Sequence, residues 1–227
     1  MNIVTGRKNS KDIQIWALVV IFILFALTLL QHHSIFPDHW FPSQLAASAF
    51  TFLFCIWVLS EVANNAWSWK NSRTTAQDKG SYRVVISAIW LSIFIVFILR
   101  SYGIGAFTGR VQYIGMILLA AGVVLREWAI VVLGKHFTVR VQVNEDARLV
   151  TQGPYSYIRH PAYTGNLLTL TGLSLAVGSW FGTIFVLVVI GIAHEYRIRI
   201  EEEALQKAFG PDYEEYKKRT WKLLPGY

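Results

Sequence analysis

The sequence predicts an all-helical integral membrane protein with five or six membrane helices and a cytoplasmic C-terminal amphipathic helix. Three observations predict this class: the composition, a series of long apolar runs, and the distribution of Lys and Arg between them. Hydrophobic residues make up 54% of the 227 residues and charged residues only 15%, whereas soluble domains contain about 25% charged residues. A disordered chain needs low hydrophobicity and high charge, so that class is excluded.

Four apolar runs each approach the roughly 20 residues that a helix needs to cross about 30 Å of hydrocarbon. The second run contains Glu61, and the fourth contains Arg126 and Glu127. We interpret the first run as a span and not as a signal peptide, because it exceeds a usual signal segment and no small-residue cleavage site follows it. The four runs cover residues 13–30, 44–69, 84–99 and 111–134.

A fifth apolar stretch, residues 165–193, is too long for one simple crossing. Its 29 residues would extend about 43 Å as a single helix. Gly178-Ser179-Trp180, with Gly182, lies near its middle. We predict two short helices that form a hairpin, tilted or partly re-entrant, and a single long tilted helix is the alternative.

Lys and Arg are distributed unevenly between the predicted loops. Loops 70–83 and 135–159, together with the two chain ends, carry 18 of these residues, whereas loops 31–42 and 100–110 carry two. Because cytoplasmic loops are enriched in Lys and Arg, the first set should face the cytoplasm. The hairpin then brings loop 135–163 and the C-terminal tail to one cytoplasmic face, where they can build one site. The net charge of +7 fits an anionic membrane face better than nucleic acid.

Several classes of site are unsupported by the sequence. Cys55 is the single cysteine, which excludes an intrachain disulfide framework and a Cys-rich zinc site. The chain has no G-x-G-x-x-G, since residues 103–109 miss the third glycine by one place, so a Rossmann nucleotide site is unsupported. His32, His33 and His39 follow no ligand spacing, and we expect no metal site.

Two motifs in the C-terminal half carry the candidate chemistry. Gly153-Pro154 is a turn signal, and His160-Pro161 predicts an extended residue followed by a helix start. The aromatic, Arg and His residues around them could bind an anion or a nucleoside, or could form an aromatic belt with snorkelling arginines. Arg197 and Glu201 are spaced i, i+4 and share a helix face, which is equally compatible with a surface salt bridge.

The string G-P-Y-x-x-I-R-H-P-x-Y-x-G at 153–165, followed by R-x-x-x-E-E-x-x-L-x-x-x-F-G-x-x-Y-x-x-Y at 197–216, resembles the isoprenylcysteine carboxyl methyltransferase family. This family belongs to a broader group with phospholipid N-methyltransferases. The resemblance implies a membrane-embedded methyltransferase that uses S-adenosylmethionine without a Rossmann domain, in a cytosol-facing pocket. It divides the chain into N-terminal membrane helices at 1–110 and a methyltransferase core at 111–227.

Carried over by position, the resemblance implies that Arg197 holds the substrate carboxylate and that Glu201 pairs the cofactor ammonium or holds Arg197. The family often has a histidine where this chain has Ala147, and His136 could take its place. No metal is implied. The implied cofactor-binding residues are Gln142, Leu149, Val150, Tyr155, His160, Pro161, Tyr163, Glu201 and Glu202.

The favoured reaction is carboxyl O-methylation of an isoprenylcysteine-like lipidic acceptor that enters sideways from the bilayer. A carboxylate is already ionised, so the transfer needs alignment and exclusion of water but no general base. N-methylation of a phospholipid amine such as phosphatidylethanolamine is an alternative that needs a base, from Glu201, Glu202 or His160. A second alternative is that the chain is a non-catalytic membrane scaffold or sensor. The expected partners are a lipidic or prenylated substrate and membrane lipids, in a bacterial inner membrane or the endoplasmic reticulum.

Further charged and aromatic residues have two interpretations each. Arg126 and Glu127 form either a structural ion pair or the rim of the active cavity, and His194 and Glu195 belong either to the cavity wall or to an interface. We expect the linker 70–82 to be a polar surface loop. Phe209, Tyr213 and Tyr216 either dock the tail helix on the membrane surface or contact the substrate, and we predict the first.

Overall fold

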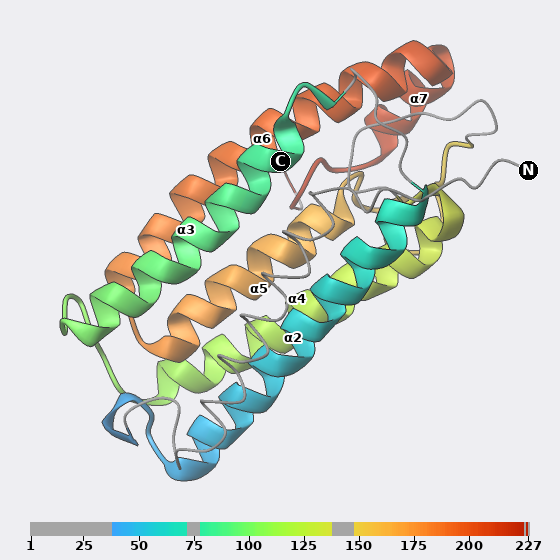
Figure 1. Cartoon of the computed structure of the whole chain (residues 1–227). Coiled ribbons are helices and arrows are strands. Elements are labelled where there is room, and N and C mark those ends of the chain that lie inside the picture. The colour runs from blue at the N-terminus through green and yellow to red at the C-terminus, as the bar shows by residue number, and fades with distance from the viewer. Residues whose placement is uncertain (1–37, 72–77, 138–147, 225, 227) are drawn as a thin grey trace, which may run out of the picture. The chain divides into compact units, whose positions relative to one another are not determined.

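The computed structural model describes residues 38–71, 78–137, 148–224 and 226. The predicted first span at 13–30 lies outside the described residues. The described elements are all helical, which confirms the predicted fold class. They are α2 (Gln44–Asn71), α3 (Ser81–Ser101), α4 (Arg110–Leu133), α5 (Pro161–Val177), α6 (Trp180–Phe209) and α7 (Pro211–Arg219), with short 3-10 turns η1 (Asp38–Trp40), η3 (Gly134–His136) and η4 (Gly153–Ser156) (Figure 1).

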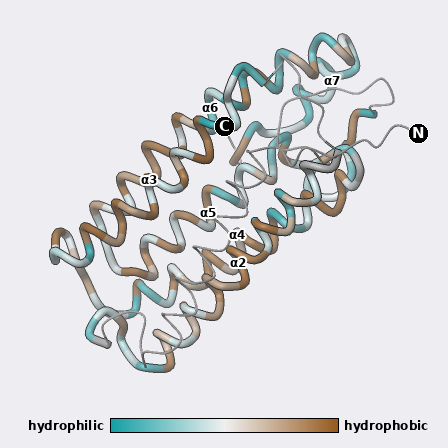
Figure 2. Tube along the Cα trace, viewed as in Figure 1, coloured by the Kyte–Doolittle hydropathy of each residue, from teal (hydrophilic) through white to brown (hydrophobic). Residues whose placement is uncertain are grey.

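Four of the described helices are long and apolar enough to cross a membrane. They are Gln44–Ser68, Ser81–Ser101, Arg110–Leu133 and Trp180–Phe209, so the predicted second, third and fourth spans are confirmed as helices. Large apolar side chains remain exposed on them, for example Phe94, Ile117 and Val131. Figure 2 shows this apolar character along the helices and a hydrophilic end that contains α7. An exposed apolar surface of this kind is stable in lipid and not in water.

The fifth apolar stretch forms the predicted hairpin, so the single-helix alternative is wrong. Gly178 ends α5 with a φ of 84°, in the left-handed region that glycine adopts without strain. The Ser179 hydroxyl then accepts a hydrogen bond from the Gly182 N–H and caps α6. The chain therefore reverses at the predicted Gly-Ser pair.

The second arm of the hairpin is not short, which corrects the prediction. Helix α6 has 30 residues and continues through Arg197 to Phe209, so the tail does not begin with a helix of its own. The sequence between 194 and 209 contains no Gly or Pro, and its Ala, Leu, Glu and Lys residues favour continued helix. Only α7, after Gly210-Pro211, is a separate tail helix.

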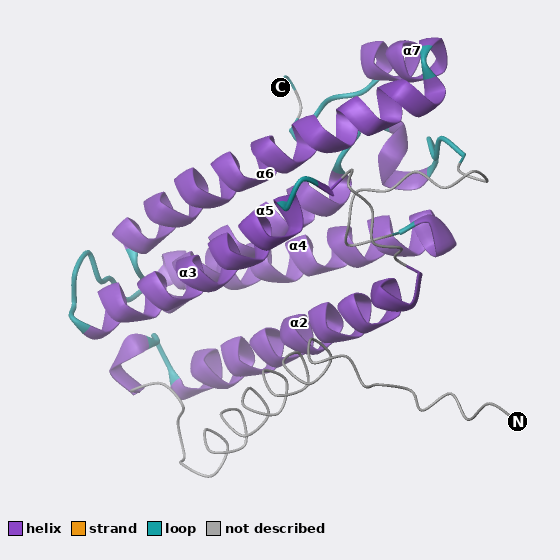
Figure 3. Cartoon of the chain, turned by 45° about the horizontal axis from the view of Figure 1, so that its top comes forward, coloured by secondary structure: helices purple, strands orange, loops and turns teal. Residues whose placement is uncertain are grey.

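The closest helix pair in this part of the chain is α4 with α5. Glycines on both helices let the backbones meet: a Cβ on Gly122 would lie 2.4 Å from Thr169 N, and one on Gly172 would lie 2.3 Å from Leu119 N. Small residues allow this close approach between membrane helices. Helix α6 packs against α3 and α5, and α2 packs against α4 (Figure 3).

Loops gather at the two ends of these helices, as the Lys and Arg distribution predicted. At one end the α5–α6 turn meets the α3–α4 loop, where the Phe107 N–H donates to the Gly178 carbonyl at 2.9 Å. At the other end residues 78–80, 148–160 and α7 come together. Loop 135–163, as far as it is described, and the tail therefore lie at the same end.

Candidate active site

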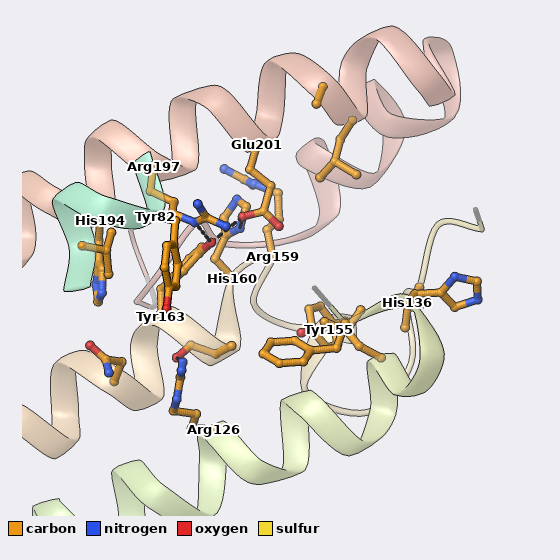
Figure 4. Close-up of a pocket in the computed structure, with 18 of the residues that line it drawn as sticks. Tyr82, Arg126, His136, Tyr155, Arg159, His160, Tyr163, His194, Arg197 and Glu201 are labelled. Atoms are coloured by element: carbon orange, nitrogen blue, oxygen red, sulfur yellow. Dashed lines mark hydrogen bonds and ion pairs between the residues drawn. The ribbon is translucent and has the colours of Figure 1, made fainter. Parts of the chain in front are cut away.

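A pocket lies at the end of the helices where the two motifs meet. Its wall draws residues from α2, α3, α4, α5, α6 and α7, and from the segment that precedes α5. Figure 4 shows Tyr155, His160 and Tyr163 of the first motif facing the same space as Arg197 and Glu201 of the second. Sequence positions more than thirty residues apart thus form one polar wall.

Tyr163 connects the two motifs directly. Its hydroxyl donates to Glu201 Oε2 at 2.7 Å and accepts from Arg197 Nε at 2.9 Å. Arg197 and Glu201 share the pocket-facing side of α6, as their spacing predicted. His160 Nε2 lies 3.1 Å from Glu202 Oε1. The predicted meeting of the two motifs around one site is therefore confirmed.

Arg197 is also held from α3, by a contact that the sequence did not predict. Its Nη1 donates to Asp78 Oδ1 at 2.7 Å and to Ser81 Oγ at 2.8 Å. Asp78 is 8% exposed, so the expectation that linker 70–82 is a polar surface loop is wrong at this residue. Asp78 lies three residues before Ser81, the first residue of α3, and accepts from the Tyr82 N–H. An acidic residue beside a helix start was the available signal.

The segment before α5 is tied to the last residues of the described chain. The Arg159 N–H donates to the Trp221 carbonyl at 2.7 Å, and the His160 N–H donates to the Lys222 carbonyl at 3.2 Å. The Thr164 hydroxyl donates to the Leu223 carbonyl at 2.7 Å. These contacts between segments far apart in sequence fix the backbone that carries His160.

Arg159 reinforces this connection through its side chain. Its Nε donates to Glu202 Oε1 at 3.2 Å, and its Nη1 donates to the Lys217 carbonyl at 3.0 Å. Arg159 therefore joins α6 and α7 to the first motif. Sequence reasoning placed Arg159 in the motif but gave it no role.

Tyr216 faces the pocket and not the membrane surface. Its hydroxyl donates to the Tyr155 carbonyl at 2.7 Å, and burial raises the pKa of Tyr216 to about 12, so it remains a neutral donor at physiological pH. Phe209 also lines the pocket, and Tyr213 is 1% exposed. The prediction that these three residues dock the tail on the membrane surface is wrong, because the reversal at Gly210 turns α7 back onto the site.

The structure places most of the predicted cofactor-binding residues on the pocket wall. Pro161 is buried as the first residue of α5 and serves the helix start. Glu202 supports His160 and Arg159 from behind the wall. Gln142 and Ala147 lie outside the described residues, and His136 does line the pocket. The predicted residues on the wall are Leu149, Val150, Tyr155, His160, Tyr163, Arg197 and Glu201.

The charged residues inside the spans form pairs between helices. Arg126 binds both carboxylate oxygens of Glu61, with Nη2 2.9 Å from Oε2, and its Nη1 donates to the Ala162 carbonyl at 3.2 Å. Glu127 accepts from Asn64 Nδ2 at 2.7 Å. Both Arg126 and Glu61 line the pocket. Arg126 therefore lines the pocket and forms an ion pair, but its partner is Glu61 and not the neighbouring Glu127 of the prediction, and Glu127 is not among the residues that line the pocket.

His194 and Glu195 separate in the structure. His194 is 1% exposed, lines the pocket and lies 5.1 Å from the Tyr163 ring. Glu195 accepts from Lys222 Nζ at 2.6 Å and from Arg199 Nε at 2.8 Å. Hence His194 belongs to the cavity wall and Glu195 to the interface with the tail.

Fold and site together define a polytopic helical membrane protein with a polar pocket at one end. Residues 114–207 match the model of the isoprenylcysteine carboxyl methyltransferase (ICMT) family. Over 117 residues the chain is 32% identical to a probable protein-S-isoprenylcysteine O-methyltransferase of Oryza sativa subsp. indica, covering 51% of this chain and 61% of that protein. Over 109 residues it is 35% identical to a protein-S-isoprenylcysteine O-methyltransferase of Schizosaccharomyces pombe, covering 47% and 46%.

A solved structure of the eukaryotic intramembrane Ras methyltransferase ICMT has a similar fold. The TM-score is 0.53 at 23% identity, over 80% of this chain and 62% of that chain. The chain spans about half to three-fifths of the relatives' own length. Residues 114–207 therefore match the family that the motifs indicated, the isoprenylcysteine carboxyl methyltransferase family, and the resemblance inferred from the motifs is confirmed over that range.

Proposed function

We propose that the chain is an S-adenosylmethionine-dependent methyltransferase that methylates the carboxylate of an isoprenylcysteine-like lipidic acceptor. The observation that carries this proposal is the hydrogen-bonded series Arg197–Tyr163–Glu201 on one pocket wall. It sets a cation and an anion side by side, as a carboxylate acceptor and a cationic methyl donor together require. The names of the relatives support the same reaction.

The residues present fit the proposed cofactor. Glu201 lines the pocket with a partly exposed side chain and can accept from an ammonium group. Leu149 and Val150, with the buried Tyr155, offer an apolar surface against which a nucleoside can pack. S-adenosylmethionine, when bound, supplies a methyl group on a positively charged sulfur. Burial raises the pKa of Tyr155 well above its ordinary value, so no tyrosinate charge competes with Glu201 for that cation.

The acceptor carboxylate is assigned to Arg197. A guanidinium has five N–H donors and can serve more than one acceptor, so the carboxylate would share Arg197 with Asp78. Tyr163 and Asp78 hold the guanidinium in one orientation, which aligns the bound carboxylate before reaction. No proton has to leave an ionised carboxylate, and binding at this wall would remove part of the water that solvates it.

The apolar part of the acceptor is assigned to the α3 side of the pocket. Val85, Ile86 and Ile89 line it there, on the helix whose first residue, Ser81, accepts from Arg197. An apolar surface that continues into a membrane helix suits a prenyl chain entering from the lipid. We assign the pocket to the cytoplasmic face, because this end of the helices carries the Lys- and Arg-rich loops.

The test is incubation of the purified full chain with methyl-labelled S-adenosylmethionine, N-acetyl-S-farnesylcysteine and total lipid. The proposal expects a labelled farnesylated product that releases methanol in alkali, as an ester does. An alkali-stable labelled lipid would instead assign the chain to amine methylation. Calorimetry in detergent gives a second readout, and a chain that binds no S-adenosylmethionine would overturn the proposal.

A further inference from the structure

Two buried polar side chains on the pocket wall have no role in the proposed reaction. His194 and Asn166 are each 1% exposed, and both line the pocket. Within the described part of the chain, neither ring nitrogen of His194 has a hydrogen-bond partner, and neither has Asn166 Oδ1. Buried polar atoms are nearly always hydrogen-bonded, because an unpartnered one loses the hydration it had in water. Three such atoms on one wall therefore need a partner.

Their place in the fold relates them to the proposed carboxylate site. His194 precedes Arg197 by three residues on α6, and Asn166 follows Tyr163 by three residues on α5. Residues spaced i, i+3 are neighbours on a helix surface, about 5–6 Å apart at Cβ. Since Tyr163 and Arg197 touch, His194 and Asn166 both lie about one turn from that contact, toward the α5–α6 turn. The Tyr163 ring packs 5.1 Å from the His194 ring.

The chemistry of the two side chains limits what can bind them. An amide oxygen only accepts a hydrogen bond, and an imidazole can both accept and donate. A ligand that satisfies them must therefore bring an O–H or N–H donor. The Asn166 side chain is uncharged, so a neutral O–H or N–H group can donate to its oxygen. A charged ligand group is not needed there.

An unpartnered buried atom by itself does not indicate a ligand. Ser92 Oγ and Thr171 Oγ1 are also buried without a partner in the described residues, but neither residue lines the pocket. His194 and Asn166 differ because they combine burial, an open hydrogen-bonding capacity and contact with the cavity. Thr171, on the same helix as Asn166, therefore provides a matched control.

We propose that His194 and Asn166 form a second polar subsite, which binds a neutral O–H or N–H group on the carbon next to the acceptor carboxylate. The inference builds on the proposed function, since it takes Arg197 as the carboxylate site, and it narrows the acceptor class. A lipid acid with a hydroxyl or amide beside its carboxylate fills both subsites. An unsubstituted lipid acid leaves His194 and Asn166 without a partner.

Three acids with the same farnesyl chain distinguish the effect of the hydrogen-bond donor from the effects of the oxygen and of bulk. They are 2-hydroxy-, 2-methoxy- and unsubstituted 3-(farnesylthio)propionic acid. The methoxy group keeps the oxygen and loses the donor, and the unsubstituted acid controls for bulk. Binding to the full chain in nanodiscs is measured by calorimetry, and KM and kcat are measured in parallel. We expect the hydroxy acid to bind about 5-fold more tightly than the other two, with kcat little changed, as one neutral buried hydrogen bond predicts.

The variants decide whether the two side chains cause this preference. His194→Phe and Asn166→Leu should bring the affinity ratio to about 1, Thr171→Val should leave it unchanged, and His194→Gln should restore part of it. A purely structural role would lower the melting temperature without changing the ratio between the acids. Equal affinities in the unaltered chain, or a preference that persists in both disabling variants, would overturn the inference.

The experiment distinguishes failure of the proposed function from failure of the proposed subsite. If no acid is methylated, but the binding preference is present and is lost in both variants, carboxyl methylation is wrong and the subsite stands. If the acids are methylated and bind equally, carboxyl methylation stands and the subsite is wrong.

Discussion

Two buried arginines lie at opposite ends of α3, and their surroundings differ. Arg100 ends the helix and is 6% exposed, whereas Arg197 packs beside Ser81 at its start and is 5% exposed. The 21 residues of α3 separate these positions by about 30 Å. Both guanidinium groups are buried to the same degree, so burial does not distinguish a structural arginine from a functional one.

The partners of the two arginines do distinguish them. Arg100 donates to the carbonyls of Trp40 at 2.8 Å and Phe107 at 3.1 Å, and its guanidinium lies 5.6 Å from the Trp40 ring. Among the described residues it has no ion-pair partner, and it does not line the pocket that contains Arg197. Arg197 is bound by the Asp78 carboxylate and the Tyr163 hydroxyl, on the wall of a cavity.

This comparison separates two uses of a buried charge in a membrane protein. Backbone carbonyls compensate Arg100 with their dipoles, and because they come from separate segments, the arginine ties those segments together. A carboxylate beside a cavity is a partner that a ligand can share or exchange. We therefore infer that Arg100 stabilises one end of the fold and that Arg197 acts on the acceptor at the other end.

The largest expected effect is on turnover, from Arg197→Gln. This change removes the charge that we assign to the acceptor carboxylate, and loss of one such positioned contact lowers the rate about 10²- to 10³-fold. The measurement is kcat/KM for a farnesylated acid, with cofactor affinity by calorimetry as the control. An unchanged kcat/KM in this variant would show that Arg197 does not act in the reaction. The proposed functional difference between Arg197 and Arg100 would then be wrong.

The next effect is on stability, from Arg100→Met. The apolar side chain leaves the Phe107 carbonyl without this donor, and the Trp40 carbonyl keeps only its bond from Gln112 Nε2. The loss should destabilise the fold by about 2–3 kcal/mol. The measurement is thermal unfolding in detergent by circular dichroism. Turnover per folded molecule should match that of the unaltered chain; a selective loss of turnover at equal stability would contradict the assigned role.

A smaller effect on turnover is expected from Tyr163→Phe. The ring still packs on His194, but the hydroxyl that joins Arg197 to Glu201 is lost. Loss of one hydrogen bond to charged groups predicts a decrease of about 10-fold in kcat/KM, with the melting temperature nearly unchanged. Full activity in this variant would show that Arg197 and Glu201 are oriented without their shared tyrosine.

The smallest effect is expected at the surface of the same end. Lys79 Nζ lies 2.8 Å from Glu203 Oε2, but both side chains are more than half exposed. Water and salt screen such a pair, so Lys79→Ala should change neither the melting temperature nor kcat/KM measurably. A clear loss in either quantity would mean that this ion pair helps to hold Asp78 against α6.

Some features of this molecule could be predicted because they depend on neighbouring residues. The α5–α6 turn is an example: Gly178 tolerates a left-handed backbone and Ser179 caps the next helix, so the reversal is encoded in adjacent residues. The shared face of Arg197 and Glu201 is another, since helical periodicity alone sets it. The motif strings then identified the pocket wall from His160 to Glu201.

Contacts across helices could not be predicted in the same way. From the sequence, Asp78 is predicted to be a polar linker residue. The packing of α3 against α6 instead buries it against Arg197. Arg126 has Glu127 beside it in sequence, but adjacent helical side chains point apart, and its carboxylate comes from Glu61 on α2.

The sequence by itself determined the helical membrane fold, the site of the hairpin turn and the two motifs, because hydropathy, glycine conformation and helical spacing are local properties. The tertiary structure decided which charges neutralise one another and which polar side chains of the pocket wall are left without a hydrogen-bond partner. Those outcomes depend on the three-dimensional distance between segments far apart in the chain. The open hydrogen-bonding atoms of His194 and Asn166 became visible only when α5 and α6 were packed against each other.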